Sequence, residues 1–169
     1  MKHKQVASLL FDTHFVMRRT LWTVIAIFAV IVLAIGIVLL TRSEQRTNVT
    51  LGGTTFSSRI AKTDASRSKG LADVTNLAPN QAMLLAFKTD DKWQIWMKDM
   101  KISIDILWLD SDKKVIYIVN DAPFQNGTST IYTPDSDARY VLELAAGTAK
   151  AKNIEVGQTA SFTIKGAVQ

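Results

Sequence analysis

The stretch Trp93 to Asp110, WQIWMKDMKISIDILWLD, contains three of the chain's four tryptophans, two lysines and three aspartates within an otherwise apolar strand pattern. A charged group inside an apolar strand destabilises the fold unless it is paired or hydrogen-bonded. The stretch is therefore either a constrained structural network or a functional site.

A strand is predicted over residues 102–109 (ISIDILWL), because every second residue there is apolar. The residues between them change from polar at the start of the strand to apolar at its end. A polar turn follows, so residues 115–119 are expected to form its antiparallel partner. Further strands are expected at 54–62, 82–87, 139–144 and 159–165, with short helices at 65–71 (N-capped by Asp64) and 145–152 and a long loop at 121–137. This order predicts a mainly β (α+β) domain, a compact small β-barrel or sandwich with two short helices.

Residues 21–40, LWTVIAIFAVIVLAIGIVLL, carry no charge and are long enough as a helix to cross a bilayer. We expect a membrane span here, preceded by a basic cytoplasmic arm (1–20) and followed by a linker (41–53) and an extracytoplasmic domain (54–169). The cations before the span indicate a cytoplasmic N-terminus, and hence a single-pass protein of the cell membrane. A cleaved signal peptide is the alternative, but the apolar run is longer than the usual h-region.

Composition excludes several kinds of site. The chain has no cysteine, and its two histidines, His3 and His14, both precede the apolar run. Thiol nucleophiles, thiolate or histidine-ligated metals and histidine-based triads are therefore not expected in the domain, and we predict no cofactor and no metal. The net charge of +5 is concentrated in the arm, and the rest of the chain carries 16 Lys and Arg against 14 Asp and Glu. Nucleic-acid binding is not expected.

A series of motifs spread over the domain resembles the DUF192 (UPF0127) family. The motifs, in order, are Arg67-x-x-Gly70-Leu71, Met83-Leu84-x-x-Phe87, Trp96-Met97-Lys98 with Asp105, Tyr132-x-Pro134, Arg139 to Leu144 (RYVLEL), Ala146-Gly147 and Ile154-x-x-Gly157. The resemblance implies a compact, mostly β domain with short helices, usually exported or membrane-anchored in prokaryotes, and it implies no particular activity. The chain departs from the family pattern at Ala72, at Asp99-Met100 and at Ser103, where the family usually has Met, Asn-Thr and Pro.

Asp105 is the sharpest candidate site residue, since burial between Ile104 and Ile106 would raise its pKa while a nearby cation such as Lys98, Lys101 or Arg139 would lower it. The alternative is a structural role, in an ion pair or as an acceptor of backbone N–H groups from a loop. Trp93, Trp96 and Trp108 are either a stacking platform for a sugar or peptide or part of the core.

The expected function is a binding or accessory module at the cell envelope, with an envelope glycan or a protein as partner. Its expected ligand-binding residues are Trp93, Trp96, Lys98, Asp105 and Arg139. The alternative is an envelope-associated, glycan-directed hydrolase that uses Asp105 with Lys98 and Glu143.

Overall fold

A computed structural model describes residues 21–36, 45–124 and 130–169 of the chain. The chain divides into two compact units, Met1–Ser43 and Glu44–Gln169. In the first unit, residues 21–36 form a helix, while residues 37–40 of the predicted span lie outside the described residues. Among the residues that the structure describes, no helix combines the length and the apolarity that a membrane crossing requires. The predicted span therefore stays a prediction.

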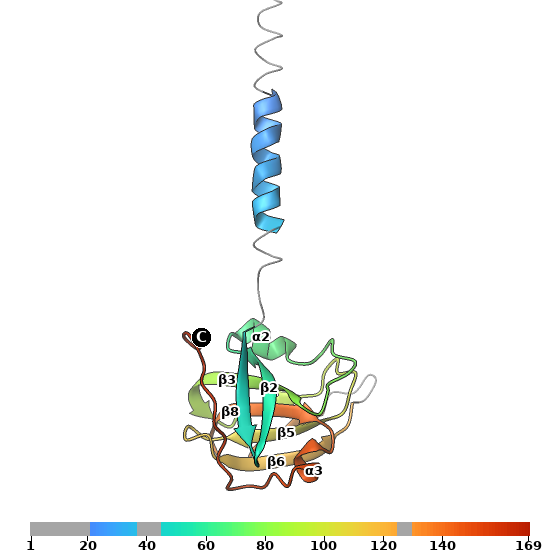
Figure 1. The fold of residues 1–169 in the computed structure, drawn as a ribbon, viewed down its shortest axis with the longest axis vertical. Helices are drawn as coiled ribbons and strands as arrows, with labels where there is room; N and C mark the ends of the chain where they lie inside the picture. Colours follow the sequence, from blue (N-terminus) through green and yellow to red (C-terminus); the bar gives the residue numbers. More distant parts are fainter. Residues whose placement is uncertain (1–20, 37–44, 125–129) are drawn as a thin grey trace, which may run out of the picture. The chain divides into compact units, whose positions relative to one another are not determined.

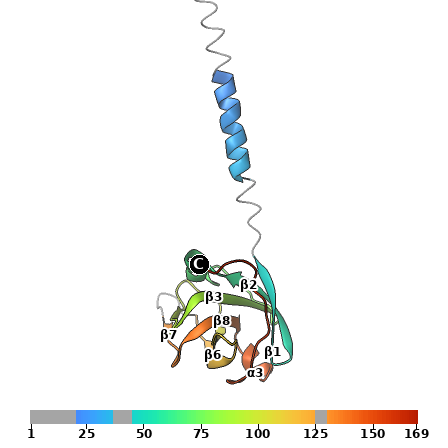
Figure 2. The same ribbon diagram turned by 90° about the vertical axis from the view of Figure 1, so that its left-hand side faces the viewer.

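The second unit is built on a six-stranded sheet of order β1-β2-β3-β8-β5-β6, in which only β2 and β3 run parallel (Figure 1). The strands are β1 (Arg46–Leu51), β2 (Thr54–Ala61), β3 (Gln81–Asp91), β5 (Ile104–Leu109), β6 (Val115–Ala122) and β8 (Ala138–Ala145). A second sheet pairs β4 (Ile95–Trp96) with β7 (Ile131–Tyr132), and β7 is labelled in Figure 2. Two short helices, α2 (Asp64–Lys69) and α3 (Thr148–Ala151), complete the domain. The prediction of a mainly β domain is confirmed.

The sheet is buried on both faces, which explains the pattern of β5. All six residues of this central strand are buried. Ile104, Ile106 and Trp108 face a core cluster that includes residues of β3, β4 and the segment after α2, whereas Leu107 and Leu109 face a second cluster with β1, α3 and the C-terminal segment. A strand covered on both sides reads as a nearly continuous apolar run, and this is why the alternation weakens along its length.

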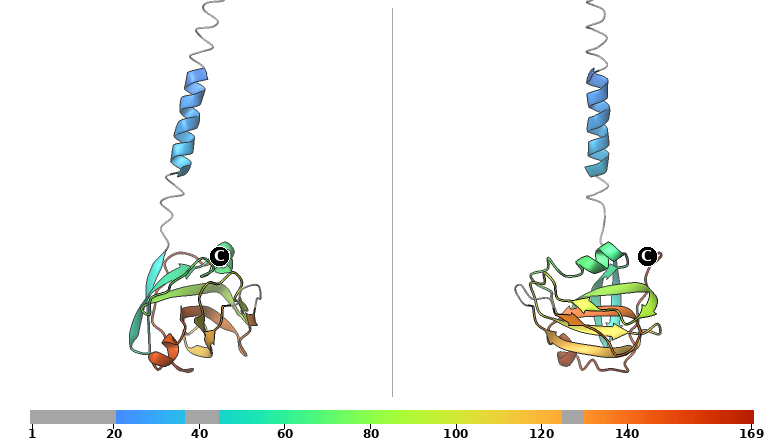
Figure 3. Two further views of the ribbon diagram at one scale, coloured as in Figure 1. Left: turned by 90° about the vertical axis from the view of Figure 1, so that its right-hand side faces the viewer. Right: turned by 180° about the vertical axis from the view of Figure 1, so that it is seen from behind.

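The sheet is open, so the predicted barrel is wrong. The C-terminal segment runs along the two edges of the sheet but pairs with them in isolated bridges, Thr50 of β1 with Ser161 and Lys114, just before β6, with Thr159. The strand predicted at 159–165 is accordingly not a continuous strand. The segment continues past the sheet and ends beside α2, where Gln169 N–H donates to the Lys62 carbonyl (Figure 3).

Two local predictions are also corrected. The linker expected over 41–53 contains β1, whose alternating polar residues pair along their whole length with β2 at the sheet edge. The N-cap of α2 is Thr63, one residue before the expected Asp64. Thr63 Oγ1 accepts the Ser66 N–H at 3.2 Å, and the Ser66 hydroxyl in turn accepts the Thr63 N–H at 3.0 Å, which is a capping box.

Candidate ligand pocket

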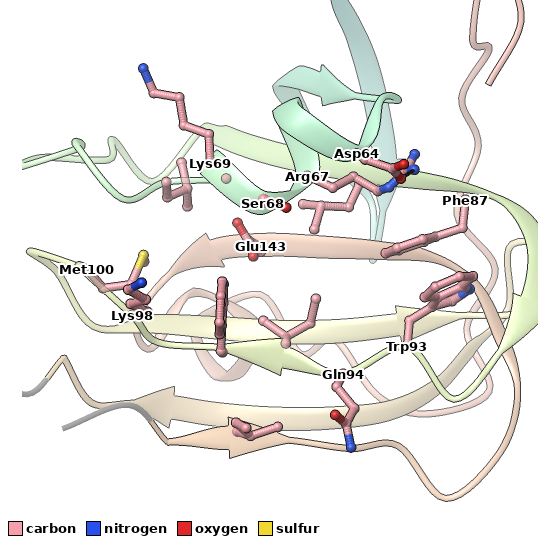
Figure 4. Close-up of a pocket in the computed structure, with 16 residues that line it drawn as sticks. Asp64, Arg67, Ser68, Lys69, Phe87, Trp93, Gln94, Lys98, Met100 and Glu143 are labelled. Atoms are coloured by element: carbon pink, nitrogen blue, oxygen red, sulfur yellow. Dashed lines mark hydrogen bonds and ion pairs between the residues drawn. The ribbon is translucent and has the colours of Figure 1, made fainter. Parts of the chain in front are cut away.

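One face of the sheet carries a pocket of about 390 Å³ between α2 and the segment of β4 (Figure 4). This volume lies in the usual range for small-molecule sites, roughly 300 to 1,000 Å³. The lining combines apolar and aromatic side chains with a few polar groups, the composition that small-molecule sites share. Its residues are Asp64, Arg67, Ser68, Lys69, Gly70, Leu71, Leu85, Phe87, Trp93, Gln94, Ile95, Trp96, Lys98, Met100, Ile131 and Glu143.

The aromatic wall of the pocket is fixed by stacking and hydrogen bonding. Phe87 and Trp93 are parallel, with ring centroids 4.2 Å apart and an interplanar angle of 11°. The Trp93 indole N–H donates to the Thr89 carbonyl at 3.1 Å, and the Arg67 guanidinium lies 5.0 Å from the Phe87 ring centroid. Because Arg67 also donates to the Ala86 carbonyl at 2.8 Å, this wall is held from both sides.

Trp96 and Lys98 form the open side. Trp96 is 48% exposed and lies in β4, opposite Ile131 of β7. The Lys98 ammonium lies 5.3 Å from the centroid of its ring, a cation–π arrangement. Within the described part of the chain, no carboxylate lies within 4.0 Å of Lys98. A ligand entering the pocket thus meets an indole face and a solvated cation first.

Glu143 forms the base of the pocket. Its neighbours in β8, Leu142 and Leu144, face the core on the other side of the sheet. Because successive side chains of a strand point to opposite faces, Glu143 lies on the pocket side. Its carboxyl group is directed from β8 toward α2, with Phe87 and Trp93 to one side and Lys98 to the other (Figure 4). The residue is 5% exposed, and no hydrogen-bond partner of its Oε2 atom is found among the described residues.

The surroundings of Glu143 favour its protonated form. Burial raises the pKa of the Glu143 carboxyl group to about 7, and attraction to Arg59 opposes this rise. Arg59 lies in the same cross-strand row but is separated from Glu143 by Met83, which pairs with both. A buried carboxyl group without a donor for one oxygen is costly, and a ligand that supplies the missing hydrogen bond would relieve that cost.

The end of α2 allows the main chain to pass close to this carboxyl group. Gly70 has φ +45° and ψ −124°, a conformation that side chains other than hydrogen disfavour. A Cβ atom at Gly70 would lie 3.9 Å from Glu143 Oε2 and 3.5 Å from the Arg67 carbonyl oxygen. Space is therefore available, and the backbone conformation is what requires glycine.

Asp105 lies on the other face of the sheet and has a complete set of donors. Its Oδ1 accepts the N–H groups of Asp121 at 2.9 Å and Gly147 at 3.0 Å, and its Oδ2 accepts that of Ala149 at 2.8 Å. The side chain is fully buried. This is the backbone-acceptor alternative considered above, and it ties β6 and the start of α3 to the centre of the sheet.

The structure brings together four of the six candidate residues. Trp93, Trp96, Lys98 and Glu143 line one pocket, whereas Asp105 does not. Arg139 lies outside it as well, paired with Asp90 at 2.6 Å, and this contact raises its pKa. Trp108 is fully buried and donates to the Trp93 carbonyl at 2.8 Å, so it belongs to the core.

Sequence reasoning missed Phe87, Arg67 and Gly70 as parts of the pocket. All three belong to the motifs that carry the family resemblance, but strand spacing alone could not place them beside Glu143. In the described ranges, no three His, Cys, Asp or Glu side chains lie close enough together to hold a metal ion.

Comparison with known proteins identifies relatives along most of the domain. The model of the DUF192 family, described as "Uncharacterized ACR", matches residues 47–162. A UPF0127 protein of Thermococcus kodakarensis is 29% identical over 105 residues, and one of Thermococcus gammatolerans is 30% identical over 107. The matches cover 62% of this chain and span 64% and 65% of the lengths of these relatives.

Two crystal structures are similar to the chain. A protein of Sinorhizobium meliloti, described as a candidate transcription regulator, aligns with a TM-score of 0.64 and 28% identity, over 71% of this chain and 95% of that one. A protein of unknown function from Novosphingobium aromaticivorans aligns with a TM-score of 0.66 and 27% identity, over 72% and 88% of the two chains.

Proposed function

The chain belongs to the DUF192 family, and we propose that its domain is a glycan-binding module displayed at the cell envelope. The observation that carries the proposal is the buried Oε2 atom of Glu143, which has no hydrogen-bond partner in the described structure and belongs to a pocket with aromatic walls. A sugar ring supplies hydroxyl groups that donate to a carboxyl oxygen and an apolar face that packs on indole. Trp96, which is half exposed at the open side, offers such a face.

Binding is favoured over hydrolysis by the positions of the acidic groups. A glycosidase of the usual kind needs two carboxyl groups, roughly 5 to 9.5 Å apart, on either side of the scissile bond. Asp105 faces the core opposite the pocket, so the pair considered from the sequence does not meet there. The other carboxylate of the lining, Asp64, is bound by Arg67 at 2.5 Å. Glu143 is thus left to receive a hydrogen bond rather than to act in a pair.

Anchoring and location are part of the same proposal. The uncharged run 21–40 and the cations that precede it support a single span with the N-terminus in the cytoplasm and the domain outside. This arrangement would hold the pocket next to envelope polysaccharides. A protein partner is the remaining alternative for the ligand.

A glycan array probed with the full-length chain in detergent tests the proposal, followed by titration of any glycan that binds. We expect Trp96→Ala and Glu143→Leu to weaken binding about tenfold or more, since the first removes the indole face and the second removes both carboxyl oxygens, while Arg139→Gln, outside the pocket, leaves it unchanged. If no glycan binds, or if binding is indifferent to both pocket substitutions, the proposal is wrong. Capture of a protein partner that depends on Trp96 would favour the alternative instead.

A further inference from the structure

The charged groups around the pocket include one buried carboxyl group and solvent-exposed cations. Glu143 is buried at the base of the pocket, whereas Lys98 is exposed at the open side. Arg67 and Asp64 are paired with each other, and Lys69 pairs with Asp73, which does not line the pocket, at 3.3 Å. With Glu143 protonated, the lining carries an excess of positive charge.

We propose that the ligand is an anionic sugar, whose ring hydroxyl groups bind Glu143 and whose carboxylate or phosphate group pairs with Lys98. This inference rests on the proposed function and specifies the class of glycan. Both kinds of ligand are a hexose with one anionic substituent, and titrations with a uronic acid and with a sugar phosphate distinguish the carboxylate from the phosphate.

The base of the pocket favours a hydroxyl group over an ammonium group. A hydroxyl group donates and accepts, so it can satisfy both the O–H and the carbonyl oxygen of a protonated carboxyl group, whereas an ammonium group donates only and gains a charge-assisted bond only from the ionised form. An ammonium group would also add charge to a lining that already holds Arg67, Lys69 and Lys98. Because burial opposes ionisation of Glu143, the neutral donor is the better match.

The open side favours an anion. The Lys98 ammonium lies over the Trp96 ring, and within the described ranges no carboxylate neutralises it. A ligand ring that packs on Trp96 would displace Lys98 from the indole face and bring it beside the ring substituents. Lys69 is less suited to this role, since its side chain extends away from Glu143 (Figure 4). Lys98 is therefore the residue that selects for charge.

Four matched sugars test the inference with the full-length chain: glucose, glucuronate, glucose 6-phosphate and glucosamine, titrated in low salt and followed by NMR. One solvent-exposed ion pair contributes up to about 1 kcal/mol, so glucuronate and glucose 6-phosphate should bind about three- to fivefold more tightly than glucose. Glucosamine should bind most weakly. Lys98→Met should remove the preference for the anions, so that glucose, glucuronate and glucose 6-phosphate bind with equal affinity. Lys101 is an exposed lysine of the same loop that does not line the pocket, so Lys101→Met is the matched control and should keep the preference.

The outcomes separate this inference from the proposed function. Equal binding of glucose and the two anionic sugars, or tightest binding of glucosamine, overturns the assignment of an anionic ligand and leaves a glycan pocket in place. A preference that survives Lys98→Met also overturns it. A preference for glucuronate alone identifies a uronic acid, and one for glucose 6-phosphate alone identifies a phosphorylated sugar, and either result supports the inference. Absence of binding by all four sugars contradicts both proposals.

Discussion

At the scale of single residues, two buried carboxyl groups of the central strands have opposite surroundings. Asp105 accepts three backbone N–H groups, whereas Oε2 of Glu143 is left without a donor in the described part of the chain. The hydrogen bonds compensate the desolvation of Asp105, whereas the desolvation of Glu143 Oε2 is left uncompensated. Burial alone therefore does not identify a site; the number of donors that the fold provides does.

The raised pKa of Glu143 predicts that the domain loses stability as the pH rises. Below about pH 4.5, the value of an ordinary glutamate, both the folded and the unfolded state hold the proton. Between about 4.5 and 7 only the folded state holds it, so the free energy of unfolding falls with pH by up to about 3 kcal/mol and stays low above 7. Urea denaturation at pH 5 and pH 8 measures the fall.

The Glu143→Gln variant should lose most of this dependence and be more stable than the wild type at pH 8. Glu155→Gln, which changes an exposed glutamate, should retain it. Identical pH profiles for Glu143→Gln and the wild type would show that Glu143 is ionised in the folded protein near its ordinary pKa.

Asp105→Asn should lower stability without affecting the pocket. The amide keeps one acceptor oxygen and directs an NH₂ group toward at least one of the three N–H donors, which we expect to cost about 2 to 4 kcal/mol. Chemical denaturation of the variant, with exposed Asp112→Asn as control, gives the value. Unchanged stability together with lost ligand binding would return Asp105 to the site.

At the scale of the elements, long apolar patterns were predictable and short polar ones were not. The strands expected at 82–87, 102–109, 115–119 and 139–144 correspond to β3, β5, β6 and β8, because each contributes to a two-sided core. β1 reads as a linker because it is a polar edge strand, and β4 and β7 have two residues each, too few for a period to appear.

The same limit applies to the pocket. It forms where α2, β3, β4 and β8 meet, and a contact between elements that are separate in the sequence leaves no periodic signal. Trp93, Trp96, Lys98 and Glu143 were found through their chemistry, as aromatic or charged groups in apolar surroundings. Of the two acidic candidates, Glu143 lies on the face of the sheet that carries α2, and Asp105 lies on the other face. The sequence does not show which face of the assembled sheet α2 covers, so it could not decide between them.

Gly70→Ala tests the backbone at the end of α2. The positive φ there should cost alanine about 1 to 3 kcal/mol of stability, although a Cβ would make only ordinary contacts. Thermal or urea denaturation measures the loss. Gly53 also has a positive φ and open space around an added Cβ, so Gly53→Ala provides a reference for conformational strain away from the pocket. A neutral Gly70→Ala would contradict the assigned conformation.

At the scale of the whole molecule, the two units have separate expected roles, an anchor in residues 1–43 and a binding domain in residues 44–169. With the span as proposed, protease added to spheroplasts, in which only the cytoplasmic membrane is intact, should digest the domain of the full-length chain. Replacing Ile31 and Leu33 by lysine should abolish membrane retention, because each charge at the centre of a span costs about 2.5 to 3.5 kcal/mol of insertion. A domain that is protected from protease until the spheroplasts are lysed would contradict the topology.

The central claim, that the Glu143 pocket is a ligand site, is tested most directly by mapping NMR shift changes during titration with glucuronate. We predict changes at the Gly70 amide and at the indole N–H groups of Trp93 and Trp96, lost in Glu143→Leu, with none at Gly147 and Ala149, the donors to Asp105 on the opposite face. Changes confined to Gly147 and Ala149, or a titration unaltered by Glu143→Leu, would contradict it.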